Sequence, residues 1–172
     1  MIGKKIEDAL NDQMNFEMFS ANIYLAMAAQ FDAMNLTGLA NWMKVQYQEE
    51  IFHMMKFYDF LNECSGRAVF TALDAPPTEW DSPLAAFEHA LKHERIVTGR
   101  INDLVTLAAD EKDHATANFL QWFVAEQVEE ESSVDAVIQQ LTLSSGAPGA
   151  LFMLDRELGQ RVFTPPAQGD AQ

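Results

Sequence analysis

Four long stretches of this chain carry apolar residues at the spacing of an α-helix. They lie at about 5–34, 39–64, 83–110 and 114–143. Steps of three, four and seven residues give each stretch one apolar face; the first stripe, for example, contains Leu10, Met14 and Tyr24. Gly and Pro interrupt helices, and most of the 8 Gly and 6 Pro residues fall outside these stretches. The pattern predicts four helices of roughly 40 Å each.

The connections between the stretches predict how the helices are arranged. Those near 35–38 and 111–114 are short, so each joins an antiparallel pair. The middle connection, about 65–81, contains Pro76 and Pro77 and shows no helical periodicity. A segment of that length can extend for roughly 55 Å, enough to run the whole length of a helix. The sequence therefore predicts an all-α protein, a four-helix bundle with one long crossover.

A short fifth helix is predicted at about 148–159. Pro148 suits a first helical position, and an apolar face is formed by Leu151, Leu154 and Leu158. This face either packs on the bundle or forms an assembly contact. We expect one domain over residues 1–163 and a flexible, polar tail over 164–172.

Charge and composition exclude several classes of protein. The formal net charge is −15, and nucleic-acid binding requires a basic patch or arm. No apolar run approaches the ~18 residues of a membrane span, and we expect no signal peptide. Cys64 is the only cysteine, so no intrachain disulfide can form, and we expect it to be a small buried hydrophobe. A cytoplasmic protein is predicted.

Each of the four apolar stripes is interrupted near its middle by a carboxylate. The four residues are Glu17, Glu50, Glu94 and Glu130. A single such residue would be an edge residue or protonated, because an unpaired buried carboxylate loses several kcal/mol of solvation. Four at similar heights need a source of positive charge, and Lys56 and Arg95 lie off the inner faces. Two divalent metal ions would balance four carboxylates.

A histidine adds a nitrogen ligand to this set. Glu50-x-x-His53 places both side chains on one face, one turn apart. Mixed carboxylate and imidazole ligation favours iron, manganese or zinc. We expect the remaining histidines, His89, His93 and His114, to be solvated.

At this point the sequence resembles the ferritins, and specifically the bacterial non-haem ferritins, over about residues 5–160. The segments that carry the resemblance are LNDQMNFEMFSANIY, YQEEIFHMMKFYDFL, HERI and NFLQWFVAEQVEEE. The resemblance implies a ferritin-like bundle with a di-iron ferroxidase centre. One iron would bind to Glu17, Glu50 and His53. The second would bind to Glu50, Glu94 and Glu130, so that Glu50 bridges the pair.

Further roles follow from the same resemblance. Gln127 would lie near the oxygen-binding side of the centre, and Tyr24 would be an electron donor or a core tyrosine bonded to a ligand. A third iron site maps onto Glu49, Glu126, Glu129 and Glu130.

The sequence departs from related families at informative positions. Stable di-iron enzymes and bacterioferritins have a second E-x-x-H on the fourth helix, where this chain has Gln127-x-x-Glu130, so the second iron should be held less tightly. Bacterioferritins bind haem through a methionine at the position of Ile51, so no haem is expected. Ala117 and Leu120 stand where animal ferritins line their iron inlet with acids, which puts that route in doubt.

The function implied is iron storage. Fe(II) would enter a hollow shell of 24 identical subunits, be oxidised by O2 or peroxide, and be stored as ferric oxyhydroxide. The main alternative is a stable di-iron oxidoreductase such as a rubrerythrin-like peroxidase, against which the absent histidine argues. A DNA-protecting mini-ferritin would need a basic arm. A metal-free helical bundle would leave the four carboxylates unexplained.

Overall fold

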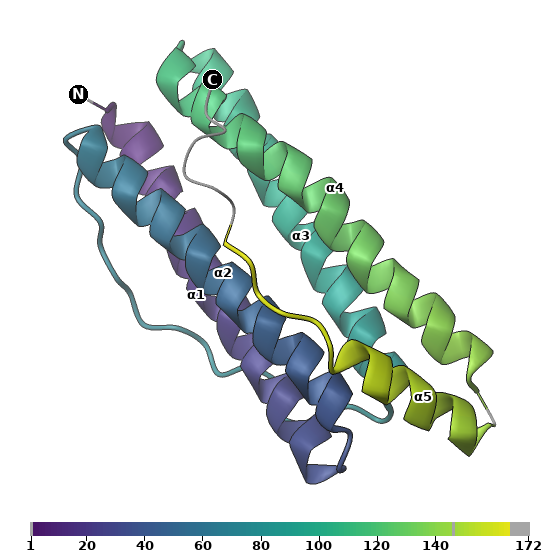
Figure 1. Cartoon of the computed structure of the whole chain (residues 1–172). Coiled ribbons are helices and arrows are strands. Elements are labelled where there is room, and N and C mark those ends of the chain that lie inside the picture. Colours follow the sequence, from purple (N-terminus) through teal and green to yellow (C-terminus); the bar gives the residue numbers. More distant parts are fainter. Residues whose placement is uncertain (1, 146, 166–172) are drawn as a thin grey trace.

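The computed structural model describes residues 2–145 and 147–165, and all of its regular structure is helical. The helices are α1 (Lys4–Ala33), α2 (Thr37–Glu63), α3 (Pro83–Asp110), α4 (His114–Leu143) and α5 (Pro148–Leu158). Figure 1 shows the first four as a bundle, with α5 across one end. The prediction of an all-α bundle with a short fifth helix is confirmed. The predicted flexible tail lies almost entirely outside the described residues.

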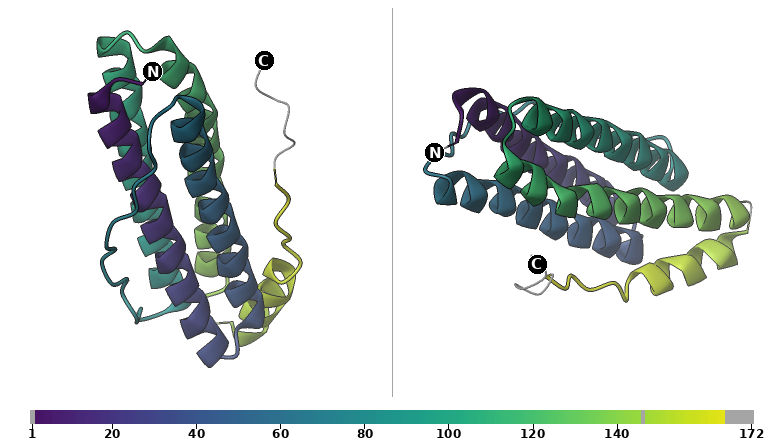
Figure 2. Two further views of the ribbon diagram at one scale, coloured as in Figure 1. Left: turned by 90° about the vertical axis from the view of Figure 1, so that its left-hand side faces the viewer. Right: turned by 90° about the horizontal axis from the view of Figure 1, so that it is seen from above.

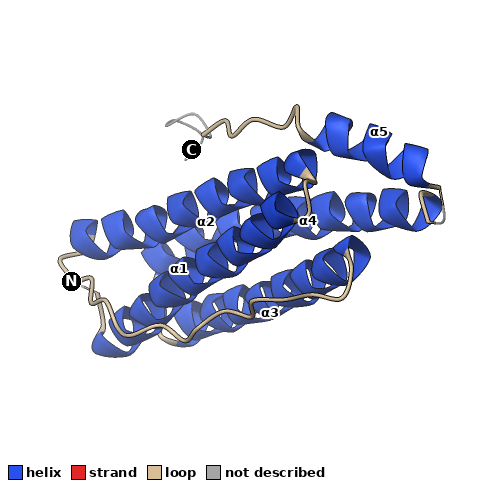
Figure 3. Cartoon of the chain, turned by 90° about the horizontal axis from the view of Figure 1, so that it is seen from below, coloured by secondary structure: helices blue, strands red, loops and turns tan. Residues whose placement is uncertain are grey.

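The four long helices form two antiparallel pairs, α1 with α2 and α3 with α4 (Figure 1). The crossover between α2 and α3 runs along the outside of the bundle, which makes those two helices parallel (Figure 3). Side chains of α1 hold this segment: Asn15 binds the backbone of Val69 and Thr71, and Gln30 binds both backbone groups of Trp80. These contacts satisfy backbone groups that no helix or strand would otherwise pair.

Local sequence signals set two of the helix starts. Ser82 accepts a hydrogen bond from the backbone N–H of Ala85 before Pro83 opens α3, and Asp113 accepts one from Thr116 at the start of α4. Both are N-caps, in which a side-chain oxygen satisfies a free N–H of the first turn.

The start of α2 depends instead on α5. One oxygen of Asp155 accepts hydrogen bonds from the N–H groups of Gly38 and Leu39, at 2.8 and 2.9 Å. A β-carbon on Gly38 would lie 1.5 Å from the backbone oxygen of Asp155, so only glycine permits this approach. The helix therefore begins at Thr37, although a connection was expected through residue 38.

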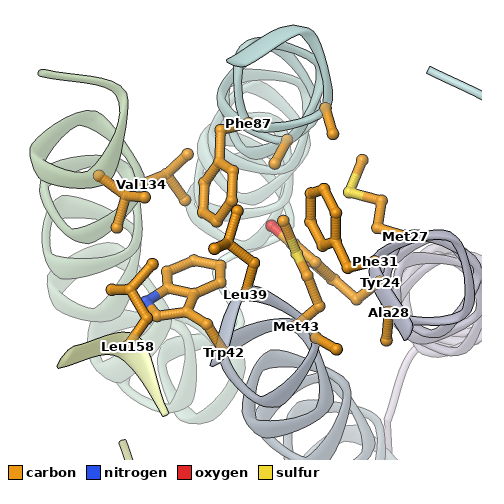
Figure 4. Close-up of a cluster of buried hydrophobic side chains, with 14 of the residues drawn as sticks. Tyr24, Met27, Ala28, Phe31, Leu39, Trp42, Met43, Phe87, Val134 and Leu158 are labelled. Carbon is orange, nitrogen blue, oxygen red and sulfur yellow. The ribbon is translucent and has the colours of Figure 1, made fainter. Parts of the chain in front are cut away.

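The core consists of two apolar clusters separated along the bundle. Figure 4 shows the cluster nearer α5, in which Phe31, Trp42 and Phe87 pack together. The second cluster surrounds Phe57 and Phe123, whose rings are stacked with centroids 4.3 Å apart. Every long helix contributes to both clusters, and its buried carboxylate lies in sequence between the two contributions. A polar layer therefore crosses the middle of the bundle.

The fifth helix is mainly a packing element within this chain. Leu154 and Leu158 are buried in the first cluster, and Leu151 packs against it. Phe152 and Met153 of the same helix remain exposed. Within the described part of the chain, no helix combines the length and apolar character needed to cross a membrane.

Candidate metal centre

Each long helix supplies one carboxylate to the polar layer. The buried set, no member of which is more than 3% exposed, is Glu17, Glu50, His53, Glu94 and Glu130. Ligand atoms of Glu17, Glu50 and His53 all lie within 4.8 Å of one another. The structure thus brings together residues from α1 and α2 that the sequence analysis assigned to one metal ion.

One oxygen of this cluster is buried without any hydrogen-bond partner. Gln13 donates to Oε1 of Glu17 at 2.8 Å, whereas Oε2 of Glu17 has no partner among the described residues. A buried acceptor of this kind carries a desolvation cost unless something binds it. A metal ion at the Glu17, Glu50 and His53 group would satisfy it, so the donor set fits a cation.

The carboxylate of Glu94 is held by two neutral donors. The Tyr24 hydroxyl donates to Oε1, and the Gln127 amide donates to Oε2 at 3.1 Å. Glu94 is therefore fixed from α1 and from α4 at once. The structure places Tyr24 and Gln127 beside Glu94, one of the residues proposed as a ligand.

Burial raises the pKa of all four buried carboxylates. The pKa of Glu17 rises to about 8, first through burial and then through repulsion from Glu50. The pKa values of Glu50 and Glu130 are well above the usual range, because burial and repulsion from Glu94 both oppose charge. Burial likewise raises the pKa of Glu94. Cations at the site would reverse this tendency, because they favour the charged form.

A second group of potential ligands adjoins the first. It consists of His53, Glu126 and Glu130, again with ligand atoms within 4.8 Å of one another. His53 lies in both groups, with Nδ1 3.5 Å from Glu50 and Nε2 3.9 Å from Glu126. Of the other acids assigned to a third iron, Glu49 is partly buried and bound to Arg161, and Glu129 is exposed.

Sequence reasoning missed two glutamines beside the carboxylates. Gln13 and Gln46 are buried, and each stands four residues before a carboxylate of the set on the same helix face. Gln46 donates to Glu130 at 2.6 Å and to Glu50 at 3.4 Å. The four-residue spacing before each carboxylate could have identified both glutamines from the sequence. No such spacing indicates the arginines that contact them, Arg100 and Arg161.

The prediction for His93 was wrong. His93 is 5% exposed, and its ring lies 2.8 Å from the Ser20 hydroxyl and stacks on Phe16 with centroids 5.3 Å apart. Burial lowers its pKa to about 4. His89 is partly buried and accepts a hydrogen bond from the Trp80 indole, while His114 is exposed as expected. Ser20 and Phe16 of α1 cover His93, so the buried face of α3 is wider than its apolar stripe predicted.

The fold and the site together define a class: helical bundles whose inward Glu and His side chains can hold metal ions between four helices. The ferritin-like domain family matches residues 7–144 of the chain. Bacterial non-heme ferritin of Bacteroides fragilis is 41% identical, an alignment that covers 94% of this chain and all of the relative. That of Staphylococcus aureus is 42% identical, with 95% and 98% covered.

Solved structures agree with this assignment. An open pore ferritin from the archaeon Archaeoglobus fulgidus superposes with a TM-score of 0.93 at 52% identity, covering 94% of this chain and 100% of that one. An engineered closed form of the same archaeal ferritin gives 0.94 at 53% identity, with 95% and 100% covered. The chain belongs to the ferritin family.

Proposed function

We propose that the chain is a subunit of an iron-storage ferritin that oxidises Fe(II) at the polar layer of its own bundle. The observation that carries this is the set of four buried carboxylates, one from each of the four long helices, beside His53 and with an unpartnered oxygen on Glu17. Four buried carboxylates in an apolar core carry a large desolvation cost, which bound cations would offset. The matches to bacterial non-heme ferritins support iron as that cation.

In this proposal two Fe(II) ions are the substrates of a di-iron ferroxidase centre. Glu17, Glu50 and His53 hold one ion, and Glu50, Glu94 and Glu130 hold the other. Two Fe(II) give up two electrons, which with two protons reduce O2 to hydrogen peroxide or reduce peroxide to water. The protein contributes ligand positions and charge compensation, and the metal ions carry the redox step.

The neighbouring residues have supporting roles in the same proposal. Tyr24 donates a hydrogen bond to Glu94, a contact that supports a role for Tyr24 as an auxiliary electron donor. Gln127 orients Glu94 on the side where the oxidant would bind. A third iron would bind at Glu49, Glu126, Glu129 and Glu130, next to the pair, and receive or relay oxidised iron.

Storage requires an assembled shell. We propose a homo-oligomer of 24 subunits in the cytoplasm that stores ferric oxyhydroxide in its cavity, without haem, nucleic-acid or membrane partners. The similarity to the open pore ferritin of Archaeoglobus fulgidus supports a shell architecture.

The test combines particle mass with iron content after aerobic loading with Fe(II). A particle of about 24 chains holding far more iron than its side-chain sites could bind supports the proposal. About two firmly held irons per chain without mineral would indicate a stable di-iron enzyme. Protein that takes up no iron would contradict both.

A further inference from the structure

Residues 159–165, which follow α5, lie along α2 (Figures 1 and 2). Asn41 of α2 binds the backbone oxygen of Arg161 at 2.9 Å, and the ring of Phe163 lies 6.3 Å from that of Phe52. Residues 159–163 are thus fixed against the face of α2 next to Glu49.

The guanidinium of Arg161 makes three kinds of contact there. Nη2 donates to Oε2 of Glu49 at 2.6 Å, and Nη1 donates to Oε1 of Gln46 at 3.1 Å. Its central carbon lies 4.3 Å from the centre of the Trp42 ring. Arg161 and Glu49 are each 23% exposed at the side chain, so this pair is shielded from most of the solvent.

The contact with Gln46 decides which way that amide faces. Arginine has donors only, so Gln46 must present its oxygen to Arg161 and its NH2 group to the core. The NH2 group then donates to Glu130 at 2.6 Å and to Glu50 at 3.4 Å. Reversal of the amide would direct an oxygen at two carboxylates. Arg161 therefore orients a donor toward two proposed iron ligands that it does not touch.

The same arrangement occurs on the other side of the centre. Arg100 of α3 donates to Oε1 of Gln13 at 2.7 Å, and Gln13 donates to Glu17 at 2.8 Å. Two arginines from unrelated segments thus fix two glutamines that face iron ligands. This repetition indicates that amide orientation matters to the site.

The contact with Glu49 has a separate consequence. The group of ligand atoms within 4.8 Å of one another on this side includes His53, Glu126 and Glu130 but not Glu49. Arg161 forms an ion pair with Glu49 and so neutralises one of the negative charges at the proposed position of the third iron. A cation there must either do without Glu49 or displace the arginine.

We propose that Arg161 is a positioning residue for iron transfer. It orients Gln46 toward Glu50 and Glu130, and it holds Glu49 so that the third position binds cations weakly and releases them onward. The inference rests on the proposed third iron position. It assigns to the C-terminal segment a role in how long iron remains beside the di-iron centre.

Anaerobic titration with Fe(II) alone tests this in the assembled protein. In Arg161→Gln the third Fe(II) equivalent should bind about five- to tenfold more tightly, because a positive charge has left Glu49. After oxidation of the first two irons, a second addition of Fe(II) should be oxidised more slowly. Arg161→Lys retains the charge and should restore the affinity of the wild-type protein for the third equivalent.

Controls separate this role from simple packing. Arg156→Gln changes an exposed arginine of α5 and should bind all three equivalents as the wild type does. Arg100→Gln should weaken the first two equivalents, through Gln13 and Glu17, without tightening the third, because Arg100 binds Gln13 and Asp12 rather than Glu49. A merely structural Arg161 would lower the melting temperature in Arg161→Gln without tightening the third equivalent.

Two results would overturn the inference. One is a third-equivalent affinity in Arg161→Gln within twofold of wild type; the other is equal tightening in Arg161→Lys. Wild-type protein that binds no third equivalent would refute the proposed third site itself, which distinguishes that failure from failure of the role of Arg161.

Discussion

The side-chain amide of Gln127 donates to the carboxylate of Glu94 at 3.1 Å and to its backbone oxygen at 3.3 Å. The α4 helix thus supports a proposed ligand of α3 through a neutral donor, Gln127, which opens the Gln127-x-x-Glu130 stretch that replaces the E-x-x-H of stable di-iron proteins. The proposed second iron would lack the histidine ligand that those proteins supply from this helix. A centre that releases its product would benefit from weaker binding.

Gln127→His should therefore hold iron more firmly, because imidazole can bind the metal where the amide N–H cannot. Iron that remains at the centre after chelation and desalting is the measurement. Gln121→His, an exposed change on the same helix, is the control. Equal iron retention in Gln127→His and wild type would count against this role for Gln127.

Glu50→Ala should lose most of the rapid oxidation of Fe(II), by at least about tenfold, because Glu50 is proposed to bind both irons. Stopped-flow oxidation at two Fe(II) per subunit measures the rate. Glu88→Ala, which removes an exposed carboxylate of α3, should keep the wild-type rate. A Glu50→Ala rate within twofold of wild type would disprove the assignment.

The triple variant Glu49→Gln/Glu126→Gln/Glu129→Gln should keep the initial two-iron oxidation, since the five buried ligands are intact. It should bind about two rather than three Fe(II) equivalents anaerobically, and a second addition of Fe(II) should be oxidised more slowly. If three equivalents still bind, these acids do not form the third site.

The metal-free protein should become less stable as the pH rises from about 5 to about 8. Burial raises the pKa of Glu17 in the folded protein to about 8, above its value of about 4.5 in an unfolded chain. The folded state therefore binds the extra proton, and its stabilisation is complete below pH 4.5 and is lost as the pH approaches 8. Melting temperatures across this range should fall less steeply in Glu17→Gln. An unchanged slope in that variant would contradict the prediction.

Gly38→Ala should destabilise the protein by about 1–3 kcal/mol, because the new methyl group would overlap the backbone oxygen of Asp155. Gly99→Ala is the matched control: its β-carbon meets nothing within 4 Å, and alanine should stabilise α3 by about 0.5–1 kcal/mol. Denaturant unfolding measures the free energy of unfolding of both variants, and limited proteolysis reports whether α5 has detached. Changes of the same sign in the free energy of unfolding of both variants would show that the Asp155 contact does not control docking of α5.

Much of the fold could be predicted because its signals are local. Apolar spacing within each helix defined the four long elements, and the caps at Ser82 and Asp113 act within three residues. The length of the crossover defined the direction of α3. The buried carboxylates could be predicted for the same reason, since each interrupts an apolar stripe on its own helix.

Only the tertiary structure determined what surrounds those carboxylates. The cap of α2 by Asp155, the burial of His93 against Phe16 and the contact of Arg161 with Gln46 all join residues more than 70 positions apart. Periodicity along one helix indicates which of its faces is buried, but not which neighbouring side chain meets a given polar group. Those pairings depend on the rotation and axial register of packed helices, which follow from the fit of all their side chains together.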